Sequence, residues 1–431
     1  MKNRELANYC INSLREAGID KAEFYLATSK KYELNTSGDE LSLMRTTFDT
    51  NVNITAIKNG KKGVISLNKT DEKSLKDAID NVIEISDDSE EDAANDISPM
   101  QPVKSFSRGE SEPDLDKMYI RLKNYLTEIK TSYPKISLME SYLDFTHRCD
   151  YYVNSNGVEL SSAKGNYSFQ TMFSSKDGER SSSFNYTSFS ADDIDRELLD
   201  CASIKLLIEQ SVEQLGTKPF EGKFIGDVVI APDCLEAMIE MYLGVYLRDM
   251  ALISGTSALK DKIGRQVASE KLTLHSNPVS DEISGGYFIT PDGFEAKNMT
   301  IIDKGILKTF MLSLYGANKT SWDRALNPGG AYIIDKGDKP LDEILKSIKK
   351  GILLVRFSGG NPSRSGDFSG VAKNSYYIED GEIKYPVSET MISGNLYELF
   401  NNITDISNER IDYGRAILPW IAASGVTISG K

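Results

Sequence analysis

The sequence is poor in histidine. Only His147 and His275 occur among the 431 residues, and they lie far apart. A zinc site that needs two histidines on one helix, as in the H-E-x-x-H pattern, therefore cannot be assembled from this chain. A Ser/His/Asp site would also have few histidines to use as a base. The composition thus disfavours the commonest histidine-dependent hydrolases.

The chain also lacks a C-x-x-C pair, an apolar signal region and any apolar run approaching 18 residues. Its four cysteines are far apart, which is typical of reduced thiols in a cytoplasm. We therefore expect a cytoplasmic protein with no membrane-spanning segment. The net charge is −14, because 64 acidic residues outnumber 50 basic ones. An acidic chain without a basic patch is a poor partner for nucleic acid.

Hydrophobic periodicity divides the chain into three parts. Residues 1–98 and 99–220 each read as an α+β module with the order helix, strands, helix, and the two modules could form one domain. The pairs Asn59-Gly60 and Asn156-Gly157 are hairpin signals within them. Residues 221–431 read as a strand-rich C-terminal domain. The sequence therefore predicts an α+β protein.

One helix of the C-terminal part is apolar around most of its circumference. It is expected over residues 233–249, and its polar stripe consists of Glu236, Glu240, Gly244 and Arg248. Such a helix belongs inside a domain. It carries no histidine, so it offers no histidine ligand for a metal.

A glycine-rich segment, SGGNPSRSGDFSG, covers residues 358–370. It lacks the spacing and the G-K-[ST] ending of a phosphate-binding loop, and GDFSG is not the G-x-S-x-G motif of serine hydrolases. The favoured interpretation is a loop whose glycines allow another chain or a ligand to approach the backbone closely. A nucleotide site and a serine hydrolase remain as alternatives for this segment. The abundant carboxylates of the chain leave a glycosidase-like site or an oxygen-ligand metal site open as well.

Blocks along the chain resemble the TldD/PmbA family, also called modulators of DNA gyrase. The resemblance rests on residues 260–269, 292–311 and 358–396 and on the tail SGVTISGK, and it extends upstream to MRTTFDTNVNITAIKNGKKGVISL and NSNGVELSSAKGNYSFQT. It implies an α+β, two-domain fold with mixed β-sheets and a strand-rich C-terminal domain. It also implies a partner-dependent protease that trims unfolded peptides.

The family has two kinds of member. The TldD kind resembles a zinc peptidase with an H-E-x-x-x-H helix and a cysteine ligand near the C-terminus, whereas the PmbA kind, or TldE, lacks these groups and pairs with TldD. If residues 255–257 match the loop after the metal helix, the two histidines fall at Glu240 and Val245 and the glutamate at Met241. The cysteine falls near Tyr413. Without these ligands the chain lacks the metal chemistry of a zinc peptidase.

The resemblance therefore implies a non-catalytic, PmbA/TldE-like subunit with no catalytic residue, metal or cofactor of its own. We expect it to pair with a zinc-bearing TldD-like subunit in a cytoplasmic complex that degrades unfolded peptides, and to form a homodimer when alone. An extended peptide could add to a strand edge. The residues expected to line this groove are Gly359, Gly360, Asn361, Asp367 and Ser369. Two alternatives stay open: a protease-independent binding protein linked to DNA gyrase, and a hydrolase with an unrecognised site.

Overall fold

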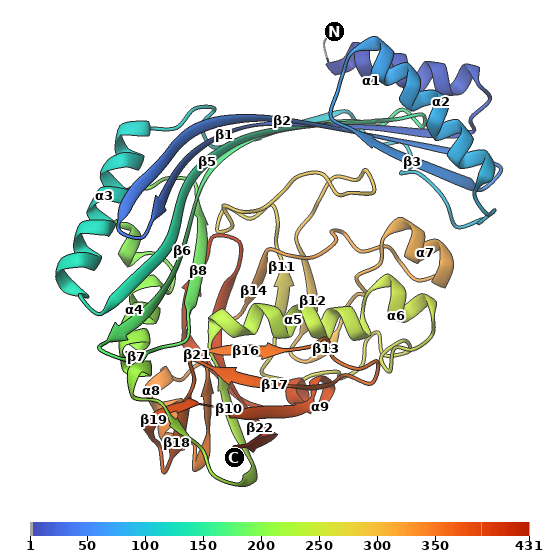
Figure 1. The fold of residues 1–431 in the computed structure, drawn as a ribbon. Coiled ribbons are helices and arrows are strands. Elements are labelled where there is room, and N and C mark those ends of the chain that lie inside the picture. Colours follow the sequence, from blue (N-terminus) through green and yellow to red (C-terminus); the bar gives the residue numbers. More distant parts are fainter. Residues whose placement is uncertain (1–2, 389, 431) are drawn as a thin grey trace.

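The structure is a computed structural model that describes residues 3–388 and 390–430. It contains two mixed β-sheets with helices packed on them, which confirms the predicted α+β class. Figure 1 shows the first sheet as an arch over the body formed by the second. Within the part that the structure describes, no helix is long and apolar enough to cross a membrane.

The first sheet has eight strands and is built around four long, neighbouring ones in the order β2-β1-β5-β6. Its strands are β1 (Lys21–Ser37), β2 (Glu40–Lys58), β3 (Lys61–Leu67), β4 (Lys104–Arg108), β5 (Ile136–Asn154), β6 (Glu159–Asp177), β7 (Arg180–Ser181) and β8 (Asn185–Ala191). Its helices are α1 (Asn3–Glu16), α2 (Glu72–Asp88), α3 (Leu115–Ser132) and α4 (Ile204–Glu213), with single 3₁₀ turns η1 (Leu198–Asp200) and η2 (Gln214–Gly216).

Strands from both predicted N-terminal modules share this sheet. β1 pairs with β5 in antiparallel register from Glu23–Asn154 to Ser37–Glu140. Apolar side chains on alternate positions of β1 pack against α1 and α2 at one end of the arch. The other end packs against α3 and α4. The modules are therefore joined by continuous strand pairing, and the boundaries at residues 98 and 220 stay predictions.

The second sheet has fourteen strands. They are β9 (Lys218–Pro219), β10 (Lys223–Ile230), β11 (Leu274–Ser276), β12 (Met299–Asp303), β13 (Ile306–Leu307), β14 (Tyr332–Ile334), β15 (Lys350–Leu354), β16 (Arg356–Gly359), β17 (Asp367–Lys373), β18 (Tyr376–Glu379), β19 (Glu382–Ser388), β20 (Met391–Asn395), β21 (Ile403–Asp412) and β22 (Ile417–Ser429). The helices of this body are α5 (Pro232–Tyr246), α6 (Asp249–Ile253), α7 (Leu314–Thr320), α8 (Leu341–Ser347) and α9 (Leu396–Asn401).

Helix α5 lies in the core of the second body. Proline at its first position, Pro232, has the backbone angle that a helix needs there and lacks only an N–H that would have no intrahelical partner. Met238, Ile239 and Leu243 are completely buried, which agrees with the predicted apolar helix. The helix ends at Tyr246, three residues earlier than predicted, because the chain turns at Leu247 and begins α6.

A pocket at the C-terminal end of helix α5

Glu240, on the predicted polar stripe of α5, is held by two partners. Nη2 of Arg248 lies 2.7 Å from its Oε2 atom, and each of the two side chains is 39% exposed. The Tyr332 hydroxyl donates a hydrogen bond of 2.5 Å to its Oε1 atom. Burial, followed by the nearby carboxylate of Glu240, raises the pKa of Tyr332, so this phenol stays a donor. The carboxylate is thus engaged by a cation and a buried hydroxyl.

The two other residues at the predicted metal-motif positions have an apolar role. Met241 and Val245 are partly buried and pack against the hydrophobic core of the second body. Neither side chain can ligate zinc as a histidine does or act as a base in place of a glutamate. The three positions therefore present one paired carboxylate and two apolar side chains.

The polar stripe of α5 continues into a cavity of about 490 Å³. Gly244 of α5, Arg248 just beyond its end, and Asp249 and Met250 of α6 line one part of it. No atom lies within 4 Å of the place that a Cβ atom on Gly244 would occupy, so this glycine leaves the stripe open. The opposite wall consists of residues from three loops, namely Pro291, Asp292, Met311, Leu312, Ser313, Arg324, Ala325, Asn327 and Pro328.

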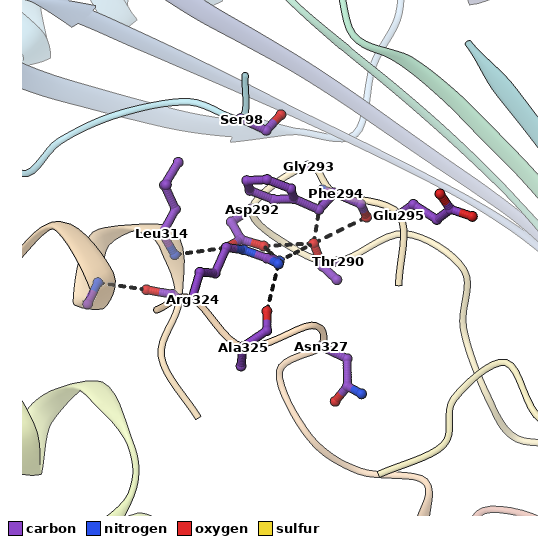
Figure 2. Close-up of polar contacts among 12 residues, drawn as sticks. Ser98, Thr290, Asp292, Gly293, Phe294, Glu295, Leu314, Arg324, Ala325 and Asn327 are labelled. Atoms are coloured by element: carbon purple, nitrogen blue, oxygen red, sulfur yellow. Dashed lines mark hydrogen bonds and ion pairs between the residues drawn. The ribbon is translucent and has the colours of Figure 1, made fainter. Parts of the chain in front are cut away.

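An ion pair between Asp292 and Arg324 forms part of that wall (Figure 2). Nε and Nη2 of Arg324 donate hydrogen bonds of 2.7 and 2.6 Å to the two oxygens of Asp292. The guanidinium also donates to the Thr290 hydroxyl and lies 3.7 Å from the centre of the Phe294 ring. The arginine and the carboxylate thus form a bidentate ion pair, which holds the loop that bears Asp292 in place.

The environment of Asp292 keeps it ionised. Its side chain is 22% exposed, and burial alone would raise its pKa. The hydrogen bonds and charge of Arg324 outweigh burial, so the pKa of Asp292 lies below the ordinary value of 3.8. The backbone N–H of Leu314 adds a further donor at 2.9 Å.

Asp249 ties α6 to α7. Its Oδ1 atom accepts from the backbone N–H of Ser313 at 3.0 Å, and its Oδ2 atom accepts from the Ser313 hydroxyl at 2.5 Å. Like Glu240 and Asp292, this carboxylate is engaged by neighbours within the protein. Each of these three carboxylates around the cavity therefore has a partner within the protein.

Tyr413, the predicted position of the missing cysteine, lies elsewhere. It is buried beside Asp233, in the first turn of α5. Glu240 lies seven positions along the helix from Asp233, a rise of about 10 Å. The structure thus does not bring Tyr413 next to Glu240, and its equivalence to the family's cysteine stays a prediction.

The predicted groove residues lie on the hairpin formed by β16 and β17. All five of them, Gly359, Gly360, Asn361, Asp367 and Ser369, are exposed, and none lines the cavity. The hairpin is still anchored to α5, because the Tyr246 hydroxyl donates a hydrogen bond of 2.9 Å to the Ser365 carbonyl. A Cβ atom on Gly359 would lie 2.5 Å from the Phe357 ring, so packing requires glycine there.

Metal-ligating side chains are dispersed in the structure. His147 lies on β5, and His275, on β11, contacts Thr300 and Asp335. Among residues 3–388 and 390–430, no group of three or more histidine, cysteine, aspartate or glutamate side chains is arranged to hold a metal ion. The residues present around Glu240 do not fit a zinc ion.

Sequence reasoning missed Tyr332, Asp292 and Arg324 as parts of this site. The Asp292-Gly293 pair is a residue pair typical of tight turns, and the structure has a bridge between Ile289 and Glu295 around it. No local pattern indicated that Tyr332, 92 residues from Glu240, donates to its carboxylate.

Two family profiles match this chain. The profile of the PmbA/TldA metallopeptidase C-terminal domain matches residues 222–430. The profile of PmbA/TldA metallopeptidase domain 1 matches residues 22–86. Together they cover more than half of the 431 residues.

Several curated relatives with similar sequences are named metalloproteases. A Metalloprotease of Methanothermobacter thermautotrophicus is 26% identical over 48% of this chain and 50% of its own length. Metalloprotease PmbA of Escherichia coli O157:H7 is 29% identical over 43% of this chain and 44% of its own length. A Zinc metalloprotease TldD homolog of Saccharolobus solfataricus is 28% identical over 47% and 48%. The chain thus spans about half the length, or less, of these relatives.

Solved structures share the whole fold. A Bacteroides thetaiotaomicron protein described as a modulator of DNA gyrase superimposes with a TM-score of 0.87 at 24% identity, covering 100% of this chain and 99% of that one. TldE from Thermococcus kodakarensis gives a TM-score of 0.81 at 19% identity, covering 97% and 99%. At these identities the likeness establishes the fold, and it agrees with the predicted architecture.

Proposed function

The chain belongs to the PmbA/TldD metallopeptidase family, and from this premise we propose that it is a non-catalytic, TldE-like subunit of a cytoplasmic zinc metalloprotease complex. In this proposal a TldD-like partner supplies the zinc and the catalytic groups. The complex degrades or processes unfolded peptides.

The arrangement around Glu240 carries the proposal. A zinc peptidase needs a metal to polarise the scissile carbonyl and to activate a water molecule. Here the carboxylate of Glu240 pairs with Arg248 and Tyr332, while Met241 and Val245 belong to the core. A pair of this kind supports the helix and leaves neither a ligand set nor a free base.

The edge of β16 suits an extended peptide. β16 pairs with β17 on one side, and among the described strands none pairs with its other side. A peptide could add there through backbone hydrogen bonds, which read little of its sequence. The exposed Gly360 leaves room for close approach, because no atom lies within 4 Å of the place that a Cβ atom there would occupy.

Co-purification with zinc analysis tests this function. The chain, without a histidine tag, is co-expressed with a tagged TldD-like subunit, and zinc is measured in the complex and in each subunit alone. We expect the two proteins to purify together and zinc to follow the TldD-like subunit. About one tightly held zinc ion per molecule of the isolated chain, or no complex, would contradict the proposal.

A further inference from the structure

A second cavity, of about 230 Å³, lies between the first sheet and the second body. Its lining consists of Glu23, Tyr25, Asn53, Thr55 and Tyr152 from the sheet and of Ile289, Thr290 and Pro291 from a loop of the second body. On the sheet, Glu23 lies opposite Thr55 of β2. Tyr25 lies in the next row, between β2 and Tyr152 of β5. Residues two positions apart on a strand share a face, so the lining side chains of the sheet lie together on the face away from α1 and α2.

The loop that forms the other wall is fastened to the segment around the start of β4. Nε2 of Gln101 donates a hydrogen bond of 2.9 Å to the Gly293 carbonyl, and Nζ of Lys104 lies 2.7 Å from Oε2 of Glu295. A Cβ atom on Gly293 would lie 2.1 Å from the Tyr152 ring, so glycine allows the turn to pack directly on this ring. Figure 2 shows the loop beneath strands of the first sheet. Both walls of the cavity are therefore fixed by contacts within the protein.

The carboxylate of Glu23 in this cavity has hydrogen-bond donors but no cation beside it. The Tyr152 hydroxyl donates a hydrogen bond of 2.5 Å to its Oε1 atom, and the Thr55 hydroxyl is a second donor. In the part of the chain that the structure describes, Glu23 forms no ion pair, and Lys62 acts on it only through its charge. Removing a carboxylate from water without a cation costs stability. A carboxylate retained in a cavity at such a cost is a candidate binding group.

We propose that this cavity binds a primary alkylammonium group, with Glu23 as its counter-ion. A carboxylate has about four lone-pair positions, and Tyr152 and Thr55 use two of them, so positions remain for the N–H donors of the ammonium group. The aromatic rings of Tyr25 and Tyr152 line the same cavity, and aromatic rings attract cations. The apolar side chains of the loop at residues 289–291 offer contact to the alkyl chain.

The charges around the cavity favour a cation over an anion or a neutral ligand. The negative charge of Asp292 acts on Glu23, whereas Arg324 is already paired with Asp292. Arg148 and Asp150 both bond to the Tyr25 hydroxyl and carry opposite charges. An anion would therefore meet the carboxylate of Glu23 without a compensating charge, and a neutral ligand would leave that carboxylate without a cation. A lysine side chain, a peptide N-terminus and a free amine all carry the required group.

Ligand-observed NMR titration of the full chain with n-butylammonium chloride tests the site, at pH 8 and constant ionic strength. We expect a dissociation constant in the millimolar range, because the probe has few atoms. Glu23→Gln should weaken binding roughly tenfold or more, because it removes the charge but keeps the size of the side chain and an acceptor for Tyr152. Glu179→Gln, at an exposed position outside the cavity, removes the same charge from the chain and should bind like wild type. Binding that Glu23→Gln leaves unchanged, or no binding to wild type, would overturn the proposal.

Three further probes test the chemistry and the source of the ammonium group. n-Butanol, a neutral analogue of the first probe, should bind at least tenfold more weakly, and equal binding of the two would overturn the proposal. Nα-acetyl-lysine methylamide presents a side-chain ammonium group, and leucine methylamide presents an α-ammonium group. Binding of the first assigns the site to a lysine side chain, binding of the second to a peptide N-terminus, and binding of n-butylammonium alone to a free amine. The titrations need no TldD-like subunit, so failure here and failure of the proposed function are separate results.

Discussion

The guanidinium of Arg248 lies 2.7 Å from the carboxylate of Glu240, although Arg248 lies just beyond the end of helix α5. The chain turn at Leu247 directs Arg248 back along the helix. Tyr332 from β14 completes the arrangement on the other oxygen. The polar stripe of α5 is thereby held by contacts within the protein.

Replacing Tyr332 by phenylalanine should lower the free energy of unfolding by about 1 kcal/mol, because Glu240 loses a buried donor while it keeps Arg248 and water. Urea unfolding measures the difference. Tyr119→Phe, at an exposed tyrosine, is the control and should change stability by less than about 0.5 kcal/mol. Equal effects of the two substitutions would show that the hydroxyl of Tyr332 stabilises nothing.

Arg324→Met should destabilise the protein by about 2–4 kcal/mol, because it leaves the mostly buried Asp292 carboxylate without its cation. Adding Asp292→Asn should recover part of the loss, which a double-mutant cycle measures.

Because the folded pKa of Asp292 is lowered, its stabilising effect is complete above its unfolded pKa, near 3.8, and is lost as pH falls through the folded value. The stability gap between wild type and Asp292→Asn should therefore shrink as pH falls below about 4. A gap that is constant with pH would contradict the ion pair.

Glu23→Gln should have the opposite pH dependence. Burial raises the pKa of Glu23, and the negative charge of Asp292 raises it further. The hydrogen bond from Tyr152 and the positive charge of Lys62 lower this pKa, but they offset only part of the increase. The unfolded chain releases this proton near pH 4.5 and the folded chain at a higher pH, so stability falls as pH rises between the two values. The glutamine variant should gain stability relative to wild type over that interval and then keep a constant gain. Denaturant titrations between pH 4 and 8 check this, and a gain that shrinks with pH would contradict it.

Asp367→Ala should weaken peptide use by the complex. The Asp367 carboxylate accepts hydrogen bonds from Ser363, Ser365 and Asn395 and so orders the loop after β16. Loss of that order should raise KM roughly fivefold, the equivalent of about 1 kcal/mol, with little change in kcat. Glu382→Ala, at an exposed position on β19, is the control. An unchanged KM would separate this loop from the substrate.

Elements set by local chemistry could be predicted from the sequence. Asp71 caps α2 by accepting from the backbone N–H of Ser74, and the buried face of that helix follows its 3.6-residue period. The run LSLMRTTFDTNVNITAI forms the single strand β2, because no glycine or proline interrupts it.

Contacts between distant segments could not be predicted. The acidic run at residues 86–92 has the composition of a solvated linker, yet Asp92 contacts Lys319 and Tyr315 and fastens the arch to the second body. Tyr332 and Arg324 likewise join the site through tertiary packing. One sequence contains the hydrophobic periods and turn residues of single elements, but it does not record which loops meet in space.

The initial rate of cleavage of an unfolded peptide shows whether this chain depends on a zinc-bearing partner for proteolysis. It is measured with the chain alone, with a TldD-like subunit alone and with the two together, each with and without a chelator. We expect no cleavage by the chain alone and a large, chelator-sensitive gain in the mixture. Cleavage by the purified chain alone that survives the chelator would contradict it and would indicate catalytic groups that act without a partner.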